Sequence, residues 1–387
     1  MITQPFLLFI SYKRKGVIHK MKVSCMKNDL LDSVNIVLKA ISNRTTLPIL
    51  ECILLETEGN LLKLTGNDLE LGIESTIPAN IEKTGCIALE AKIFSEIVRK
   101  LPEDEVRIIV DSEFMTTIKC ANSEFKIAGQ PGTDFPELPK VEKDKSFALK
   151  QGTLKDIIRQ TIFSVATEET RPILTGELIQ IKDSALHMVS VDGYRVSYRK
   201  TPLSIDNEKN EVVVPGKTLG EISKVLSSED DDVSIYFTDK HILFDLRDST
   251  VVSRLLEGDF LRYESSFYKD YETIIQINRR DLLMSIERAA LISREGKKNP
   301  VKIEINPDKI IITCNTELGT AREELPIHLE GKDLVIAFNP KYLIDALKAI
   351  DDEEIKIQFI SSLNPCIIRP IDGDDYKYLI LPIRLNN

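Results

Sequence analysis

The chain of 387 residues lacks the residue groupings that mark metal sites and disulfide frameworks. Its four histidines are scattered, so no cluster with metal-ligand spacing is visible. Its six cysteines form no C-x-x-C pair and lie mostly in apolar, strand-like runs, which favours reduced thiols in a protein core. The sequence therefore predicts no metal, no cofactor and a cytoplasmic location.

The chain also lacks a surplus of positive charge and an apolar run long enough to cross a membrane. A net charge of −10 argues against a surface that binds nucleic acid everywhere, but it leaves room for a local basic lining. The run Phe6-Leu-Leu-Phe-Ile10 is too short for a span, and cations follow it instead of preceding it. We expect no membrane partner, and we expect residues 1–20 to be a disordered extension or the product of a start codon assigned too early.

What the chain does contain is one stretch that occurs three times. Lys92, Lys217 and Lys341 each begin an amphipathic helical pattern that runs into an acidic turn and then a strand. These lysines are 125 and 124 residues apart. A period this long indicates whole repeated domains and not a solenoid.

A second set of matches divides each repeat into two similar halves, each with strands and one helix. The patterns predict an α+β fold with six helices and six small antiparallel sheets. Turn-rich connectors at 129–139 and 257–263 set the domain boundaries. We refer to 21–146, 147–271 and 272–387 as the first, second and third repeats. The predicted helices are 27–41, 92–101, 153–165, 217–226, 279–292 and 341–350.

Positive charge concentrates on these helices. They hold 14 cations and 8 anions, a net +6, which leaves −16 for the rest of the chain. A mild surplus on one helix is ordinary solvated charge, but segregation across the whole set favours a basic inner face. Six helices packed ~9.5 Å apart enclose a hole of only ~8 Å, whereas twelve enclose ~26 Å. A ring of two chains would therefore admit a DNA duplex, with the sheets outside.

Four motifs carry a resemblance to a known family. They are Arg44-Thr-Thr-Leu-Pro-Ile-Leu50, Leu64-Thr-Gly-Asn-Asp-Leu-Glu70, Val191-Asp-Gly-Tyr-Arg-Val196 and Leu381-Pro-Ile-Arg-Leu385. With these motifs the chain resembles the bacterial sliding clamp, the beta subunit of DNA polymerase III, over residues 21–387. The resemblance implies three domains of the DNA-clamp fold and a head-to-tail homodimer that encircles double-stranded DNA without reading its sequence. It also implies a processivity role with no catalytic site.

The resemblance further implies three groups of site residues. A cleft between the second and third repeats would bind short apolar peptides from the replicative polymerase, the clamp loader and repair proteins. Its residues would be Leu174, Gly193, Tyr194, Arg195, Val196, Leu261, Tyr342, Leu379, Leu381, Pro382, Ile383 and Arg384. The DNA-facing residues would be Arg44, Arg99, Lys100, Lys155, Arg159, Arg171, Lys217 and Lys348. The dimer interface would use Leu291, Ile292, Glu323 and Glu324.

One departure and two alternatives accompany this reading. The family usually has proline where this chain has Leu261, so the cleft should lose a rigid corner. An enzyme is the first alternative, because Val214-Pro-Gly-Lys-Thr218 is similar to a phosphate loop, although Glu211 replaces the glycine that this pattern needs. The second alternative is an acidic scaffold that binds peptides and never encircles DNA.

Overall fold

The computed structural model describes residues 20–42, 45–143, 146–168, 170–203, 210–227, 230–268, 270–292 and 299–384. Two predictions fall outside these residues, namely the disordered extension before Lys20 and the DNA-facing role of Arg44. The chain divides into two compact units. Unit 1 is Met1–Ser146 with Ser234–Ser253, and unit 2 is Phe147–Val233 with Arg254–Asn387. No helix in the described ranges is long and apolar enough to cross a membrane.

The helices agree with the sequence pattern in place and number. In the part of the chain that the structure describes there are six α-helices, each amphipathic with its apolar side buried. Two of them continue as short 3-10 turns, at Leu38–Ala40 and Ile162–Ser164, which accounts for the longer helices predicted there. The helices are α1 Lys27–Val37, α2 Ala91–Lys100, α3 Gln151–Thr161, α4 Gly216–Val225, α5 Arg279–Ala290 and α6 Pro340–Ala349.

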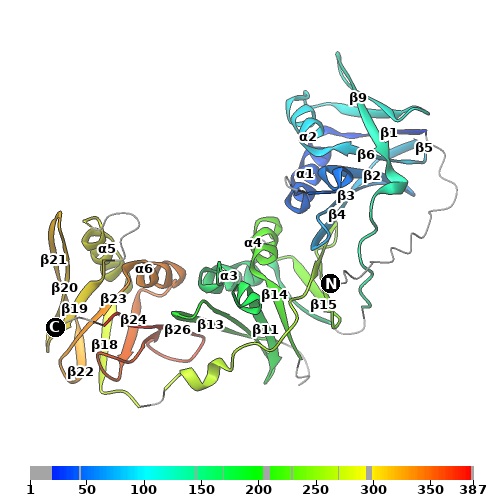
Figure 1. Ribbon diagram of the computed structural model, residues 1–387. Helices are drawn as coiled ribbons and strands as arrows, with labels where there is room; N and C mark the ends of the chain where they lie inside the picture. Colours follow the sequence, from blue (N-terminus) through cyan, green and yellow to red (C-terminus); the bar gives the residue numbers. More distant parts are fainter. Residues whose placement is uncertain are drawn as a thin grey trace, which may run out of the picture. The chain divides into compact units, whose positions relative to one another are not determined.

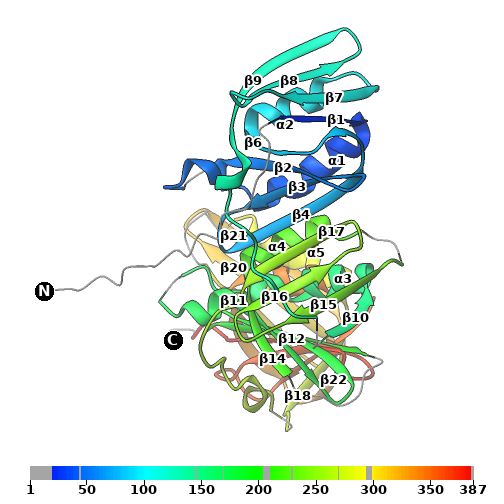
Figure 2. The same ribbon diagram turned by 90° about the vertical axis from the view of Figure 1, so that its right-hand side faces the viewer.

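The strands of unit 1 belong to a 13-stranded sheet in the order β10-β15-β16-β17-β4-β3-β2-β6-β9-β8-β7-β1-β5, where β10 is Ser146–Lys150. Strand β17 reaches β4 through pairs from Ser249↔Ser75 to Ser253↔Leu71 (Figure 2). Its strands are β1 Met21–Met26, β2 Cys52–Glu58, β3 Leu61–Asn67, β4 Leu71–Pro78, β5 Asn80–Lys83, β6 Cys86–Glu90, β7 Glu105–Val110, β8 Met115–Cys120, β9 Ser123–Pro131, β15 Asp232–Phe237, β16 His241–Asp245 and β17 Ser249–Arg254.

Unit 2 contains two antiparallel sheets, ordered β14-β11-β12-β13-β26-β25-β24-β18-β22 and β21-β20-β19-β23. Helices α5, α6, α3 and α4 follow one another along one side of its strands (Figure 1). The strands of these two sheets are β11 Gly176–Lys182, β12 Ala185–Val191, β13 Arg195–Pro202, β14 Asn210–Pro215, β18 Thr273–Asn278, β19 Val301–Ile305, β20 Lys309–Thr316, β21 Gly319–Pro326, β22 His328–Gly331, β23 Leu334–Phe338, β24 Glu354–Phe359, β25 Cys366–Pro370 and β26 Tyr376–Ile380.

The small antiparallel sheets that the sequence predicts are joined edge to edge into larger ones. Strand β13 of the second repeat pairs with β26 of the third, from Arg195↔Ile380 to Arg199↔Tyr376. An unpaired strand edge exposes backbone donors and acceptors, and this pairing satisfies both edges at once. The α+β class and the antiparallel pairing are as the sequence predicted.

Each sheet buries an apolar face that alternates along its strands. In unit 2 one core lies around Leu282, Ile286 and Leu347 of the third repeat. A second core gathers Leu174, Val196, Leu379 and their neighbours beneath the β13–β26 junction. The six cysteines are all free and buried, and burial raises the pKa of the Cys52 thiol to about 11. The expectation that the cysteines lie in the core is confirmed.

Candidate functional site

The candidate site begins at a turn between β12 and β13. The Asp192 carboxylate accepts hydrogen bonds from the backbone N–H groups of Tyr194 and Arg195, at 2.9 and 3.1 Å. Gly193 has a φ of +89°, in the left-handed region where glycine has no steric cost. This turn holds Tyr194 with 55 % of its surface exposed, while Arg195 enters the protein with only 6 % exposed.

Arg195 links three segments of unit 2 that are distant in sequence. Its guanidinium donates to Asp192 at 2.9 Å, to Asp345 of α6 at 2.7 Å and to the Phe163 carbonyl at 2.6 Å. The guanidinium carbon also lies 4.5 Å from the centre of the Tyr342 ring. A buried guanidinium needs such partners for its donors, and here they come from β12, α6 and the turn after α3.

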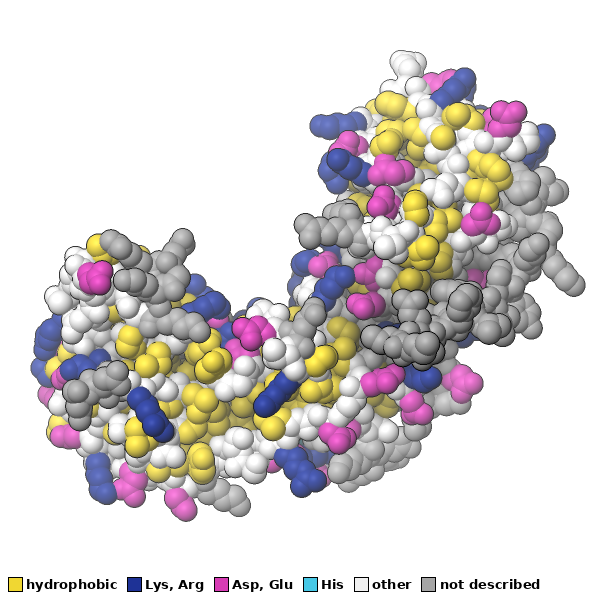
Figure 3. Space-filling model, in the orientation of Figure 1, with side chains coloured by type: hydrophobic (Ala, Val, Ile, Leu, Met, Phe, Trp, Pro, Cys, Tyr) yellow, Lys and Arg dark blue, Asp and Glu magenta, His cyan; other side chains and the backbone are white. Residues whose placement is uncertain are grey.

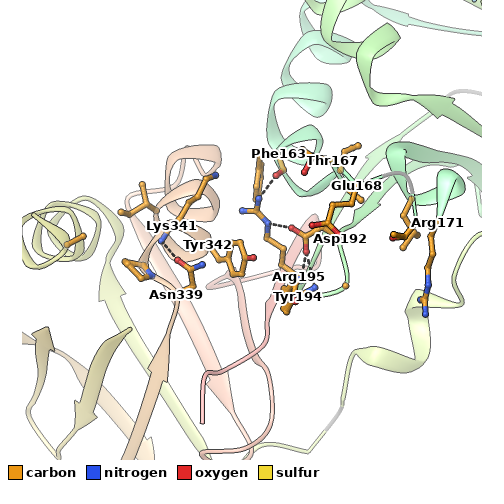
Figure 4. A pocket seen from close by; sticks show the side chains of 18 of the residues that line it. Phe163, Thr167, Glu168, Arg171, Asp192, Tyr194, Arg195, Asn339, Lys341 and Tyr342 are labelled. Atoms are coloured by element: carbon orange, nitrogen blue, oxygen red, sulfur yellow. Dashed lines mark hydrogen bonds and ion pairs between the residues drawn. The ribbon is translucent and has the colours of Figure 1, made fainter. Parts of the chain in front are cut away.

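Aromatic rings form the rim above this arginine. The rings of Tyr194 and Tyr342 stack with centroids 6.0 Å apart and an interplanar angle of 24°. In Figure 4, Tyr342 points from its helix toward Arg195, while Asn339 and Lys341 stand beside it on the same wall. Burial and the neighbouring Asp192 carboxylate raise the pKa of the Tyr342 hydroxyl. The phenol therefore stays neutral and remains a hydrogen-bond donor at physiological pH.

Asn339 and Lys341 order the start of α6 at the edge of the site. The Asn339 side chain accepts a hydrogen bond from the Lys341 N–H at 3.1 Å and so caps the helix. The Lys341 ammonium pairs with Asp345 at 2.7 Å. The Asp345 carboxylate therefore accepts hydrogen bonds from both Arg195 and Lys341. These charge-assisted hydrogen bonds hold this wall of the site in place.

These residues enclose a cavity of about 1150 Å³ that lies wholly within unit 2. Figure 3 shows apolar side chains gathering over the region where Figure 1 places β26, β13 and β11. The volume is at the upper end of what small-molecule sites offer, which suits a short peptide. The lining residues are Phe163, Val165, Ala166, Thr167, Glu168, Thr170, Arg171, Leu174, Asp192, Gly193, Tyr194, Arg195, Ala290, Asn299, Asn339, Pro340, Lys341, Tyr342 and Ile344.

The structure brings five of the twelve predicted cleft residues into this cavity wall: Leu174, Gly193, Tyr194, Arg195 and Tyr342. Val196 and Leu379 lie beneath it in the core, with 5 % exposure each. Leu381 donates its N–H to the Tyr194 carbonyl at 2.9 Å, and Ile383 donates to Ala337 at 2.8 Å. Leu261, Pro382 and Arg384 do not line the cavity, although Leu261 is 48 % exposed.

Sequence reasoning left out several residues of the site. Phe163, Asp192, Asn339 and Asp345 position the others and were not in the predicted set. A signal existed for one of them: Asp192 aligns with Asp68 in the repeat. Arg171, predicted to face DNA, lies in the cavity wall (Figure 4).

Most residues of the other predicted groups lie at the surface, and several of them have partners within the chain. Arg99 and Lys100 are exposed in the last turn of α2. Arg159 pairs with Asp351 at 2.6 Å, Lys348 pairs with Glu287 at 2.8 Å, and Lys155 donates to the Leu226 carbonyl at 3.0 Å. The exposed Lys217 also has an interaction within the chain.

At the predicted interface, Leu291 is 81 % exposed and Ile292 packs against the core of the third repeat. Glu323 pairs with Arg288. Glu324 pairs with Lys309 at 2.9 Å and also with Arg322.

Comparison with known proteins yields one family along the whole described chain. Its models match residues 21–139, 148–261 and 265–384, as the N-terminal, central and C-terminal domains of the DNA polymerase III beta subunit. A beta sliding clamp of Staphylococcus epidermidis is 38 % identical, over 94 % of this chain and 99 % of its own length.

Solved structures agree. A DNA polymerase sliding clamp from Bacillus subtilis superposes with a TM-score of 0.93 at 38 % identity, covering 95 % of this chain and 100 % of that one. A sliding clamp from Pseudomonas aeruginosa, bound to griselimycin, gives a TM-score of 0.90 at 28 % identity, over 96 % of this chain and 100 % of that one.

Proposed function

The chain belongs to the DNA polymerase III beta subunit family of sliding clamps, and we propose that it acts as a ring that encircles duplex DNA and tethers the replicative polymerase to it. The observation that carries this proposal is the unbroken series of three family domains across residues 21–384. We place the domain boundaries near 146 and 271, where the repeat spacing predicts them. The clamp has no catalytic role, and its working place is the cytoplasm.

The cavity around Arg195 and Tyr342 is the docking site for partner proteins in this proposal. Tyrosine and arginine are the residues that most often dominate binding energy at interfaces, particularly beside an apolar floor. Leu174 and Ile344 supply apolar lining, while Tyr194 and Tyr342 supply a rim. Short apolar peptides of the polymerase, the clamp loader and repair proteins would occupy it in turn, with Leu261, Leu381, Pro382, Ile383 and Arg384 extending the surface.

Two chains would close the ring head to tail. Strand β21 forms the outer edge of its sheet, and an exposed edge strand is a template for pairing with another chain. Leu291 is a large apolar side chain with 81 % of its surface exposed, and it directly follows α5, the helix that packs against β21. We assign Leu291, Ile292, Glu323 and Glu324 to this interface. The two glutamates would then exchange or share their present partners across it.

Duplex DNA would pass along the helices, held by phosphate contacts that carry no sequence information. Arg99 and Lys100 are exposed on α2, and Lys155, Arg159, Lys217 and Lys348 lie on helices of unit 2. Several of these cations are already paired within the chain, so each would release an anion on meeting phosphate. Binding to open DNA should therefore be weak and should fall steeply with salt.

A topological assay tests the proposal. The chain is loaded with its clamp loader onto nicked circular DNA, and the protein retained is measured before and after the circle is linearised. A ring stays on the circle and is lost from the linear form, because it slides off the ends. Retention that is equal on circular and linear DNA would instead support the peptide-binding scaffold. A nucleotide-hydrolysis assay with Lys217→Ala separates both from an enzyme, since no Lys217-dependent turnover is expected.

A further inference from the structure

A second cavity, of about 890 Å³, lies wholly within unit 2. Its walls come from the connector that follows β17 and from strands β12, β13, β24, β25 and β26, and we call it the connector pocket. It shares no lining residue with the cavity around Arg195, and it contains none of the site residues that the resemblance to sliding clamps implies. Its ligand therefore has to be inferred from its own chemistry.

Aromatic rings form one side of the connector pocket. Tyr263 and Phe267 of the connector meet Tyr198 of β13, with ring centroids 5.9 and 6.0 Å from that of Tyr198. Tyr268 also lines the pocket, and 44 % of its surface is exposed. Exposed aromatic rings are stacking surfaces for other flat rings. The pocket therefore favours a ligand with a planar ring.

The cations and the carboxylates of the connector pocket differ in their exposure. Four cations line the pocket and are half-buried, namely Lys182, Lys200, Arg369 and Lys377, whereas the four lining carboxylates are exposed, namely Asp183, Glu264, Asp270 and Asp374. Water screens an exposed charge more strongly than a half-buried one. Although Asp374 pairs with Arg369 at 2.7 Å, the Lys200 ammonium has no ion-pair partner within the described ranges. The interior of the pocket therefore favours an anionic group.

Two buried polar atoms of the lining residues have no hydrogen-bond partner in the described part of the chain. They are Oε1 of Gln358 on β24 and Nε of Arg369 on β25. The register Gln358↔Ile367 places these two side chains on the same face of the sheet, because Arg369 is two residues beyond Ile367. Gln358 is only 7 % exposed, so its carbonyl oxygen has lost its hydrogen bonds to water without replacement. A ligand that donates to this oxygen gains affinity from the new hydrogen bond.

We propose that the connector pocket binds an adenine nucleotide. The adenine ring lies against the aromatic side, with its N6 amine and N7 facing the Gln358 amide, which is the pairing that glutamine makes with adenine. The phosphate lies among Lys200, Arg369 and Lys377, which give it charge-assisted hydrogen bonds. The volume is within the range of small-molecule sites. This inference goes beyond the clamp function and does not depend on it, and the segment 214–218, which is similar to a phosphate loop, contributes no residue to the pocket.

Isothermal titration calorimetry of the full-length chain with adenosine monophosphate tests the proposal. The nucleotide should bind at one site per chain. Inosine monophosphate should bind about tenfold more weakly, because an oxygen replaces the N6 amine and no longer donates to Gln358. Adenosine should also bind about tenfold more weakly, since it lacks the phosphate. An absence of saturable binding, or an affinity for either analogue equal to that for adenosine monophosphate, would overturn the proposal.

Three variants locate the binding site. Gln358→Leu removes the amide at nearly constant size, and it should weaken adenosine monophosphate about tenfold and abolish the preference over inosine monophosphate. Lys200→Gln should weaken the nucleotide about threefold and leave adenosine unchanged. Arg262→Gln, at an exposed connector cation outside the pocket, should change neither. Urea unfolding checks that each variant is folded, and Lys200→Gln decides alone if Gln358→Leu is not. Saturable binding that the folded pocket variants leave unchanged would place the nucleotide elsewhere and refute the connector pocket.

Discussion

The first and second repeats share one turn and use it differently. In the first repeat Asp68 accepts hydrogen bonds from the N–H groups of Glu70 and Leu71, at 3.1 and 2.7 Å. In the second, 124 residues later, Asp192 accepts from Tyr194 and Arg195 in the same pattern. The third residue after the aspartate is a buried leucine in one case and a buried arginine in the other. The same backbone turn therefore occurs in both repeats. The side chain of the third residue after the aspartate, leucine or arginine, decides whether the repeat carries a binding site.

A second pair of positions shows the same contrast inside the core. Ile53 on β2 and Glu177 on β11 are 124 residues apart, and both are fully buried. Neither carboxylate oxygen of Glu177 has a hydrogen-bond partner, because the nearby Thr161 hydroxyl donates to the Ile157 carbonyl. Burial raises the pKa of Glu177 to about 8. The second repeat thus buries a carboxyl group at the position where the first repeat buries an apolar side chain.

The largest expected effects come from removing the side chains of Arg195 and Leu71, the third residues after the two aspartates. Arg195→Ala should lower the free energy of unfolding by about 4 kcal/mol, because Asp192 and Asp345 lose a buried partner. Leu71→Ala should cost about 3 kcal/mol through the cavity that it leaves. Only Arg195→Ala should also weaken binding of the polymerase peptide, by at least about tenfold. Urea unfolding and fluorescence anisotropy measure the two quantities.

The exposed Arg262→Ala serves as the matched control for loss of an arginine, and it should change neither quantity. If Leu71→Ala weakened the peptide as much as Arg195→Ala, the effect would reflect general loosening, and the distinction between the two turns would fail.

A smaller effect is expected at the buried carboxyl. The unfolded chain releases this proton near pH 4.5, whereas the folded chain holds it to about pH 8. Stability therefore falls as pH rises through that window, since the unfolded state binds fewer protons. Glu177→Ile should abolish this slope and raise the free energy of unfolding at pH 8 by about 2 kcal/mol. Urea titrations at pH 5, 6.5 and 8 measure the slope.

The reciprocal change sharpens the result. Ile53→Glu should introduce in the first repeat the same loss of stability with rising pH. A Glu177→Ile chain that keeps the slope of the parent would show that another group causes it.

The smallest effect concerns the residue that follows each aspartate. Leu69 has a φ of +74° where the second repeat has Gly193 at +89°. Left-handed backbone costs a non-glycine residue roughly 1–2 kcal/mol, part of which glycine returns through its greater freedom in the unfolded chain. Leu69→Gly should therefore stabilise the protein by about 0.5 kcal/mol. Thermal unfolding measures the change in stability, and Glu70→Gly is the control. If Glu70→Gly destabilises the protein, the gain from Leu69→Gly comes from the left-handed backbone and is not a general effect of glycine.

Local pattern predicted much of this molecule. Helices α2, α4 and α6 lie within one residue of their predicted bounds, because apolar spacing of three and four residues defines a buried helix face over ten residues. Strands β3, β12 and β20 begin 124 residues apart, in equivalent places of the three repeats. Motif resemblance identified Tyr194, Arg195 and Tyr342, which the structure brings together.

Contacts between residues that are far apart in sequence were not predicted. The contact from Arg195 to Asp345 joins residues 150 positions apart, and nothing in either local pattern indicates it. Every residue of β11 from Gly176 to Ile181 is buried, so the burial of Glu177 depends on what packs against both faces of the strand. Arg171 shares the cavity wall with Asn339 and Lys341, which are far from it in sequence. Such features depend on which surfaces meet, and composition does not encode that.

The β13–β26 ladder under the cavity has a consequence for how ligands are selected. Five consecutive backbone pairs, from Arg195↔Ile380 to Arg199↔Tyr376, fix the spacing of the two walls. An incoming peptide meets a site whose width is already set, so little ordering entropy is lost on the protein side. Substitution of a wall side chain can then change which peptides the site prefers without changing the distance between the two walls. Inhibitors whose shape fits the spacing of the two walls should keep their affinity when a wall side chain is substituted, whereas inhibitors that depend on one side chain should lose it.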